Sequence, residues 1–194
     1  MKHDILSLNE LFRSRRSTFP KQFVAGKKIP DDIVNQILEN ATWAPTHGQT
    51  EPWYFIVFTG EGLKKLADFQ GELYKKENAD FKQEKYLKLT EQPLVASHII
   101  AICMKRTANT RIPEIEEIAS VACAVENIYL SLEAYGIGGY WTTGGVTYTE
   151  SAKPFFGLKP EDKLLGFFYL GYAAIPSPPG KRKPISEKSE WVTK

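Results

Sequence analysis

The chain has 194 residues, of which 42% are hydrophobic and 25% are charged, and it carries a formal net charge of +2. This length and composition are typical of a folded domain with its own hydrophobic core, so we expect a single domain over residues 1–194. Because 25 basic residues nearly balance 23 acidic ones, the overall charge favours neither nucleic acid nor a membrane surface as a partner. Any site for an anion must therefore be local.

The cysteines, the N-terminal residues and the length of the apolar runs indicate the cellular compartment. Cys103 and Cys123 lie in apolar sequence without CxxC or metal-ligand spacing, so we predict no metal site and a reducing environment. The N-terminal residues lack the basic and apolar regions of a signal peptide. No apolar run approaches the roughly 20 residues that span a membrane. We expect a cytoplasmic protein.

Helical periodicity predicts two helices before the first strand. In the first, Ser7 and Glu10 have the spacing of a capping box. In the second, Pro30 precedes an acidic first turn and an apolar stripe that ends before Pro45. Residues 53–59 are continuously apolar and β-branched or aromatic, which predicts a strand in the centre of a sheet.

The middle of the chain predicts more helix and a second strand. Residues 60–92 are mostly helical and charge-rich in pattern, and Gly71 or Asn78 could interrupt them. Such a segment could cover a site as a lid, although the charge pattern favours a solvated surface helix. Residues 96–104 predict a buried strand, in which we expect His98 to be a core histidine paired with backbone and not a metal ligand.

The second half predicts the longest helix and the last strand. Pro113 and Glu114 open that helix, and Gly136 ends an alanine-rich apolar stripe that suits central packing or a dimer interface. Residues 164–172 form another buried strand, and a proline-rich tail follows. The order of elements favours an α+β domain with a mostly antiparallel sheet covered by helices. A doubly wound fold is disfavoured, because no strand is followed by a phosphate-binding turn.

Three segments carry side chains suited to binding. Residues 41–53 concentrate two tryptophans, two prolines and a histidine between a helix and a strand, as binding loops do, but a connector that fills the core edge fits equally well. Residues 15–17 offer two guanidinium groups and a hydroxyl for a phosphate or polyol, against the alternative of a solvated basic turn. Residues 138–145 combine two threonines with glycines that would let the backbone approach a ligand, against the alternative of a glycine-flanked strand and turn. They have no P-loop or GxGxxG spacing.

Together these segments resemble the nitroreductase family, most closely its short-chain subgroup. The resemblance rests on Arg15-Arg16-Ser17, the loop APTHGQTEPW at 44–53, the glycine–threonine run at 136–144, and the basic tail cluster at 181–183. It covers nearly the whole chain, in the family's order. It implies an FMN-dependent oxidoreductase of α+β fold that uses NADH or NADPH and forms a homodimer with FMN at the subunit interface.

The resemblance implies three groups of cofactor contacts. The flavin's phosphate and ribityl chain would be held by Arg15, Arg16 and Ser17, with Lys181 or Arg182 closing on the phosphate. The partner subunit would line the ring pocket with Trp43, Pro45, Thr46 and His47, and Gln49 is a further candidate. Along the isoalloxazine and ribityl side of the flavin would lie Trp141, Thr142, Thr143 and Gly144. Larger members carry Asn-x-Gln-Pro-Trp where this chain has Gln49-Thr50-Glu51-Pro52-Trp53, so we interpret Glu51 as structural, since a carboxylate beside the ring would oppose an anionic reduced flavin.

The implied chemistry is a ping-pong cycle in which NADH or NADPH reduces the flavin and departs before an acceptor, such as a nitroaromatic or a quinone, is reduced. No side chain need act as an obligate acid or base, and His47 is the one histidine considered as a proton donor. Two alternatives stay open. One is a dehalogenase-type or flavin-fragmenting enzyme on the same scaffold, and the other is a flavin-binding or sensing module without turnover.

Overall fold

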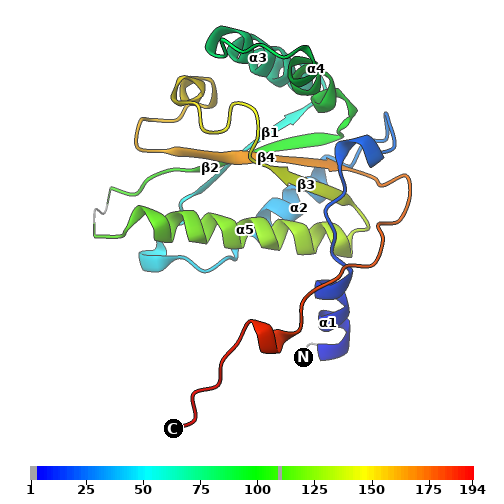
Figure 1. The fold of residues 1–194 in the computed structure, drawn as a ribbon, viewed down its shortest axis with the longest axis vertical. Coiled ribbons are helices and arrows are strands. Elements are labelled where there is room, and N and C mark those ends of the chain that lie inside the picture. The colour runs from blue at the N-terminus through cyan, green and yellow to red at the C-terminus, as the bar shows by residue number, and fades with distance from the viewer. Residues whose placement is uncertain (1–3, 109–110) are drawn as a thin grey trace.

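The computed structural model describes residues 4–108 and 111–194, which form a four-stranded sheet with helices on both faces (Figure 1). The strand order is β1-β2-β4-β3, and each of the three pairings is antiparallel. This arrangement confirms the predicted α+β class. The elements in chain order are α1 (Ile5–Ser14), η1 (Pro20–Gln22), α2 (Asp31–Thr42), η2 (His47–Gln49), β1 (Trp53–Thr59), α3 (Glu61–Glu77), α4 (Gln83–Glu91), η3 (Gln92–Val95), β2 (His98–Met104), α5 (Glu114–Ala134), β3 (Gly138–Thr142), η4 (Glu150–Phe156), β4 (Lys163–Gly171) and η5 (Ile185–Glu187).

Two hydrophobic clusters fill the space on either side of the sheet. Because successive strand residues point to opposite faces, Phe168 belongs to the cluster beneath α2 and α5, whereas Phe167 belongs to the cluster beneath α3 and η4. Figure 1 shows α5 along one face of the sheet and α3 and α4 on the other side. The sheet is therefore a buried middle layer, and any site must lie at its edges or at the ends of its strands.

The position of β1 differs from the prediction. It stands at an edge of the sheet, where it pairs with β2, and not in the centre. Every residue of β2 is buried, but most of β1 is only half-buried or exposed. Side chains of β1 nevertheless contact both clusters, Phe55 on one face and Phe58 on the other. An edge strand covered on both faces has the continuous apolar sequence of a central strand, which explains the error.

The end of α5 confirms the predicted glycine stop. Gly136 has a φ of 65°, its N–H donates to Glu133 O at 3.0 Å, and Ile137 N donates to Leu132 O at 2.8 Å. These two bonds are those of a Schellman motif, which satisfies the last carbonyls of a helix. The turn directs the chain straight into β3, so the position of β3 is set by the C-terminus of α5.

The apolar stripe of α5 divides between two faces. Val125 and Leu132 are buried in the core, whereas Ala119, Ala122 and Cys123 are exposed. The exposure of Cys123 corrects the prediction that both cysteines lie in apolar surroundings. None of the described helices has both the length and the apolarity to cross a bilayer. The exposed small residues leave a smooth surface, and its use as a dimer interface remains a prediction.

The start of α1 is capped by Asp4 and not by Ser7. Leu6 N and Ser7 N donate to the Asp4 carboxylate at 3.2 and 3.0 Å, which is the usual bonding of an N-cap. The predicted capping box of Ser7 with Glu10 is therefore wrong, because the helix begins at Ile5 and already includes Ser7. Hydrogen bonds from Ser7 hold the pKa of Asp4 below its ordinary value.

His98 is a core residue as expected, but its partners are side chains and not backbone. Its Nδ1 lies 2.9 Å from Ser97 Oγ, and its Nε2 lies 3.0 Å from Asp31 Oδ1. Ser97 Oγ also accepts from Ile29 N at 2.7 Å. This chain of polar contacts fastens the start of α2 to β2, and it corrects the predicted backbone pairing.

Residues 60–92 form α3 and α4, which confirms the helical prediction. Asn78 ends α3 as one of the two proposed interruptions. Gly71 does not interrupt it. A Cβ at Gly71 would lie 2.6 Å from Thr90 Cγ2 and 3.0 Å from Tyr86 Cε2, so the glycine lets α3 and α4 pack closely against each other.

Candidate functional site

Tyr129 of α5 joins two of the segments that the sequence singled out. The guanidinium carbon of Arg15 lies 4.9 Å from the centre of the Tyr129 ring, and Ser17 Oγ lies 3.3 Å from its hydroxyl oxygen. The same hydroxyl accepts a hydrogen bond from Trp141 N at 2.9 Å. Arg15, Ser17 and the end of β3 therefore meet around one side chain, although they are far apart in the sequence.

Tyr129 was not among the predicted site residues. The sequence placed it in the apolar stripe of α5, and its ring does pack edge-on against Phe168 at a centroid distance of 4.6 Å. A buried tyrosine hydroxyl normally finds a hydrogen-bond partner. A tyrosine in an apolar stripe was therefore a signal that its hydroxyl has a partner. The partners of Tyr129 lie 112 and 12 positions away in the sequence, so the sequence could not identify them.

The glycines of β3 make room for protein groups. Thr18 N donates to Gly139 O at 2.8 Å, and a Cβ at Gly138 would lie 2.9 Å from Thr18 Cβ. A Cβ at Gly139 would lie 2.5 Å from Phe168 Cε1. Of the two interpretations of this run, Gly138 and Gly139 fit a glycine-flanked strand, because they let the segment after Arg15 lie directly against β3. Gly144 differs, because a Cβ there would meet only Thr142 Oγ1, at 3.6 Å.

A cavity of about 230 Å³ lies between α3, α4 and the end of β3. It brings the predicted Thr142 and Gly144 together with side chains from both helices, while Thr143 is exposed next to them. Its lining residues are Gln70, Lys85, Lys88, Leu89, Gln92, Thr142, Gly144, Gly145, Phe167 and Tyr169.

Gln70 holds an unpaired polar group at this cavity. Within the part of the chain that the structure describes, its Nε2 is buried and has no hydrogen-bond partner. Leaving a buried donor unpaired costs about 1–3 kcal/mol, so such groups in folded proteins call for a partner outside the chain. The hydroxyl of Tyr169 is a neighbouring polar group, but it does not meet Nε2 in hydrogen-bond geometry; burial raises the pKa of Tyr169 more than the Gln70 side chain lowers it, so the hydroxyl stays protonated. The cavity thus offers hydrogen-bond donors to a ligand.

The indole of Trp141 is fixed by the sheet. Its Nε1 donates to Leu165 O at 3.1 Å, and a Cβ at Gly166 would lie 2.7 Å from that nitrogen. Gly166 also has a φ of 126°, a conformation that other residues rarely adopt. Trp141 therefore anchors the end of β3, and its neighbour Thr142 reaches the cavity.

The second predicted group lies elsewhere on α5. Pro45, Thr46 and His47 line a hollow of about 420 Å³ with Glu116, Ala119, Ser120 and Cys123. His47 Nδ1 is paired with the Glu116 carboxylate, and the side chain of Trp43 is 80% exposed. Glu116 precedes Tyr129 by 13 positions in one helix, which corresponds to roughly 20 Å. Within one chain His47 is therefore far from the Tyr129 group, whereas Trp43 follows Asn40, whose Nδ2 donates to Ser131 Oγ at 3.1 Å.

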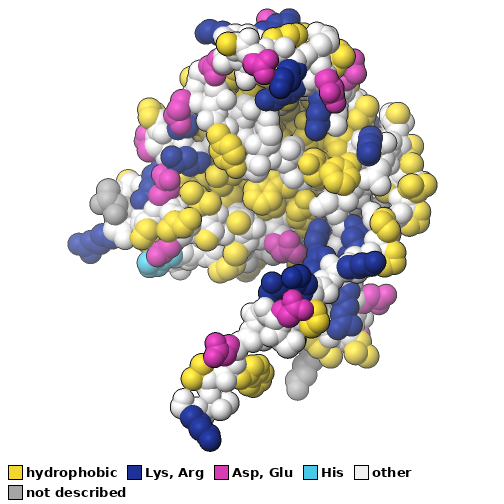
Figure 2. All heavy atoms as spheres, in the orientation of Figure 1, with side chains coloured by type: hydrophobic (Ala, Val, Ile, Leu, Met, Phe, Trp, Pro, Cys, Tyr) yellow, Lys and Arg dark blue, Asp and Glu magenta, His cyan; other side chains and the backbone are white. Residues whose placement is uncertain are grey.

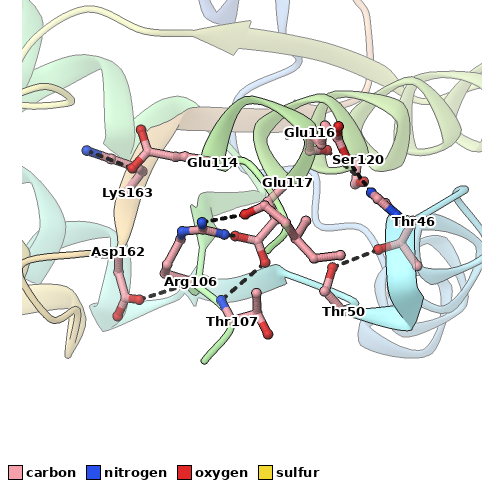
Figure 3. Close-up of polar contacts among 12 residues, drawn as sticks. Thr46, Thr50, Arg106, Thr107, Glu114, Glu116, Glu117, Ser120, Asp162 and Lys163 are labelled. Atoms are coloured by element: carbon pink, nitrogen blue, oxygen red, sulfur yellow. Dashed lines mark hydrogen bonds and ion pairs between the residues drawn. The ribbon is translucent and has the colours of Figure 1, made fainter. Parts of the chain in front are cut away.

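The loop that carries this second group has an unusual backbone. Gln49 and Glu51 have φ values of 54° and 43°, which are uncommon for residues other than glycine. Thr46 holds the loop, because its Oγ1 accepts from Glu51 N at 3.3 Å. The same oxygen lies 3.0 Å from Thr50 Oγ1 (Figure 3). Gln49 is exposed and contacts neither the Tyr129 group nor the cavity beside Gln70.

A buried ion pair, which the sequence did not reveal, joins the end of β2 to the first turn of α5 (Figure 3). Glu117 is 1% exposed and pairs with Arg106 Nη1. Arg106 Nη2 donates to Ile112 O at 2.5 Å, and Thr107 N donates to Glu117 Oε1 at 3.1 Å. Asp162 Oδ1 accepts from Arg106 N at 2.9 Å. The first turn of α5, which also presents Glu116 to His47, is therefore rigidly held.

The basic tail and the end of α1 form a further hollow of about 420 Å³. Arg182 lines it with Arg13, Arg16, Phe12 and Gly180, but Lys181 does not. Figure 2 shows basic side chains gathered where the tail crosses the end of α1. Of the two predicted tail cations, Arg182 is thus the one beside Arg16. Among the residues that the structure describes, no cluster of acidic, histidine or cysteine side chains is arranged for a metal ion.

These features can be compared with known proteins. Residues 12–172 match the sequence profile of the nitroreductase family, and the chain belongs to that family. It is 32% identical over 163 residues to YdjA of Escherichia coli K12, provisionally named an NAD(P)H nitroreductase, with 84% of this chain and 86% of the relative covered.

Two solved structures illustrate the similarity of fold. A nitroreductase-like family protein from Bacillus cereus has a TM-score of 0.82 and 26% identity, with 100% of each chain covered. The FMN-dependent nitroreductase NfnB from Mycobacterium smegmatis, solved in complex with NADPH, has a TM-score of 0.74 and 17% identity. That comparison covers 97% of this chain and 100% of the other and concerns the fold alone. Family membership confirms the resemblance inferred from the sequence.

Proposed function

We propose that the protein is an FMN-dependent NAD(P)H oxidoreductase that acts as a homodimer and reduces small acceptors such as nitroaromatics or quinones. The observation that carries this proposal is the convergence of Arg15, Ser17 and Trp141 on Tyr129, next to a cavity that holds the unpaired amide of Gln70. Membership of the nitroreductase family supports an oxidoreductase. The names of YdjA and NfnB support the choice of FMN and NAD(P)H.

The residues present fit the two ends of FMN. Arg15 and Ser17 offer a cation and a hydroxyl to the phosphate and ribityl chain, and Arg182 adds a second cation. At the other end, the isoalloxazine edge carries carbonyl and imine acceptors, for which Gln70 Nε2 is a buried and unpaired donor. Gly144 leaves space for a ring to approach the backbone. These local cations can neutralise the phosphate of FMN although the net charge of the chain is only +2.

The predicted contribution of Trp43, Pro45, Thr46 and His47 is to the site of a second chain. His47 pairs with Glu116, roughly 20 Å along α5 from Tyr129, so it could reach only a partner's flavin. Pro45, Thr46 and His47 border the exposed small-residue face of α5 that includes Ala119. A dimer that packs these faces together would be isologous, so that each chain completes the other's site.

Bound FMN would supply the redox chemistry, by accepting hydride from NAD(P)H and passing the electrons to the acceptor. The protein's own part is to bind, orient and shield. Arg15 and Ser17 hold the phosphate end, Tyr129 fixes both against β3, and Gln70 orients the ring edge. His47 is paired with Glu116, so solvent is the simpler source of protons. A shared pocket for donor and acceptor favours a ping-pong cycle.

Steady-state kinetics on the flavin-loaded protein test this proposal. With NADH or NADPH and a panel of quinones and nitroaromatics, we expect acceptor-dependent oxidation and parallel double-reciprocal plots. Intersecting plots would contradict the ping-pong mechanism alone. Flavin binding without any acceptor-dependent oxidation would favour the sensing module, and turnover confined to halogenated substrates would favour the dehalogenase alternative.

A further inference from the structure

The side chain of Arg16 is committed to main-chain carbonyl groups. Its Nη1 donates to Arg13 O at 2.6 Å and to Arg15 O at 2.7 Å, and its Nε donates to Pro178 O at 3.2 Å. Three of the five N–H groups of the guanidinium are therefore used. The first two bonds close the C-terminus of α1, where cations favour the helix dipole. The third reaches the C-terminal tail.

Arg16 is also the point where the tail is attached. The last main-chain bond between tail and body is Ala174 N to Gln22 O, at 2.8 Å. Beyond it, within the described part of the chain, the hydrogen bond from Arg16 Nε to Pro178 O links residues 175–194 to the rest of the protein. The guanidinium also packs on Gly180, where a Cβ would lie 2.5 Å from Arg16 Cζ and 2.6 Å from Nη2.

This attachment determines where Arg182 stands. Two residues after Gly180, Arg182 lines the same hollow as Arg13 and Arg16. Its Nη1 donates to Lys181 O at 2.9 Å, so the side chain is folded back along the tail and follows its position. Among the described residues, the hydrogen bonds and ion pair of the tail beyond Arg182 stay within the tail, and Trp191 is 87% exposed.

We infer that Arg16 is a positioning residue that clamps the C-terminal tail, and that Arg182, not Arg16, supplies the second cation for the flavin phosphate. The contact of Arg182 with a flavin phosphate rests on the proposed function. The attachment of the tail by Arg16 does not, because it is present without any ligand. This role replaces the assignment of Arg16 as a ligand of the phosphate and ribityl chain, which the resemblance to the nitroreductase family had implied.

The clamp is tested first without FMN. In the flavin-free protein, trypsin should cut the tail after Lys181 and Arg182 roughly three- to tenfold faster in Arg16→Ala, because the loss of the anchoring hydrogen bond increases local opening. Gly180→Ala keeps every charge but displaces the guanidinium, and should accelerate the same cuts. Arg13→Ala is the matched control, because it removes a charge from the same hollow and keeps the bond to Pro178. Cleavage of Arg16→Ala and Gly180→Ala at the control's rate would overturn the clamp.

A double-mutant cycle on FMN affinity tests what the clamp does. We expect the Kd of Arg182→Ala to rise about tenfold, and that of Arg16→Ala to rise by the same factor or less. Since Arg16 acts through Arg182, the double variant should bind FMN as Arg182→Ala does. Losses that multiply in the double variant would show that Arg16 contacts the phosphate itself, and would overturn the inference. If the unaltered protein bound no FMN, the proposed function would fail, and the proteolysis would still decide whether the clamp exists.

Discussion

The hydroxyl of Tyr129 accepts a hydrogen bond from the backbone N–H of Trp141 at 2.9 Å. Trp141 lies on β3, an edge strand of the sheet, where N–H groups that face outward need a partner. The tyrosine satisfies this N–H from the neighbouring helix and also contacts Ser17 and Arg15. The end of the sheet and the proposed phosphate site are thus held by the same side chain.

Tyr129→Phe should lower the free energy of unfolding by about 1–3 kcal/mol, because Trp141 N–H stays buried without an acceptor. The ring keeps its contacts with Arg15 and Phe168, so the core is not emptied. We also expect weaker FMN binding, because Ser17 loses a partner. Urea unfolding of the flavin-free protein and a flavin titration measure the two effects. Tyr135→Phe, at an exposed tyrosine after the same helix, is the matched control, and equal stability of the two variants would refute the role of the hydroxyl.

Gln70→Leu should have opposite effects on stability and on binding. Removing a buried donor that has no partner should leave the flavin-free protein as stable as before or up to about 2 kcal/mol more stable. If Gln70 Nε2 donates to the bound ring, FMN affinity should fall about tenfold, which corresponds to one hydrogen bond. Gln36→Leu makes the same chemical change on the exposed face of α2. A Gln70→Leu protein that is destabilised but binds FMN normally would contradict this assignment.

The buried pair of Arg106 and Glu117 should be costly to break. Glu117→Ala leaves Arg106 without its carboxylate and should lower the free energy of unfolding by about 3–5 kcal/mol. Arg106→Ala should cost a similar amount, and the double variant should cost clearly less than the sum. Lys163→Ala breaks the more exposed pair with Glu114 and should cost no more than about 1 kcal/mol. Additive losses in chemical denaturation would show that the two residues act independently.

The two cysteines provide a test of the dimer face. Burial raises the pKa of the Cys103 thiol to about 12, so this group should not react with a thiol reagent at pH 8 in the folded protein. Cys123 is exposed in the single chain, but a dimer formed through α5 would cover it. We therefore expect no rapidly reacting thiol in the native protein and two after unfolding. One fast thiol that disappears in Cys123→Ser would show that this face of α5 is open.

The sequence predicted those parts of the structure that depend on local signals. Gly136 ends α5 as its position indicated, and β1, β2 and β4 lie where the three apolar runs placed them. The edge position of β1 could not be predicted, because strand order depends on pairing with distant residues. The N-cap of α1 is Asp4, three residues before the predicted Ser7. The sequence did not distinguish them, because both residue types cap helices and they stand close together.

The candidate site was predictable in composition but not in geometry. The structure brings the candidates Arg15, Ser17 and Trp141 together, but the sequence did not identify Tyr129, which connects them. The unpaired amide of Gln70 depends on what surrounds it in the fold, and no local pattern encodes that. Arg16 stands next to Arg15 in the sequence, yet its side chain turns toward the tail, because successive residues after a helix point in different directions.

The most direct test of the account is an anaerobic flavin titration of the purified protein. We expect a yellow protein with one FMN per chain, whose absorbance is bleached by NADH or NADPH and restored when a quinone is added. Arg15→Ala should retain markedly less FMN under the same purification. A colourless protein that takes up no added FMN would contradict the central claim, and so would a flavin that NADH and NADPH both leave oxidised.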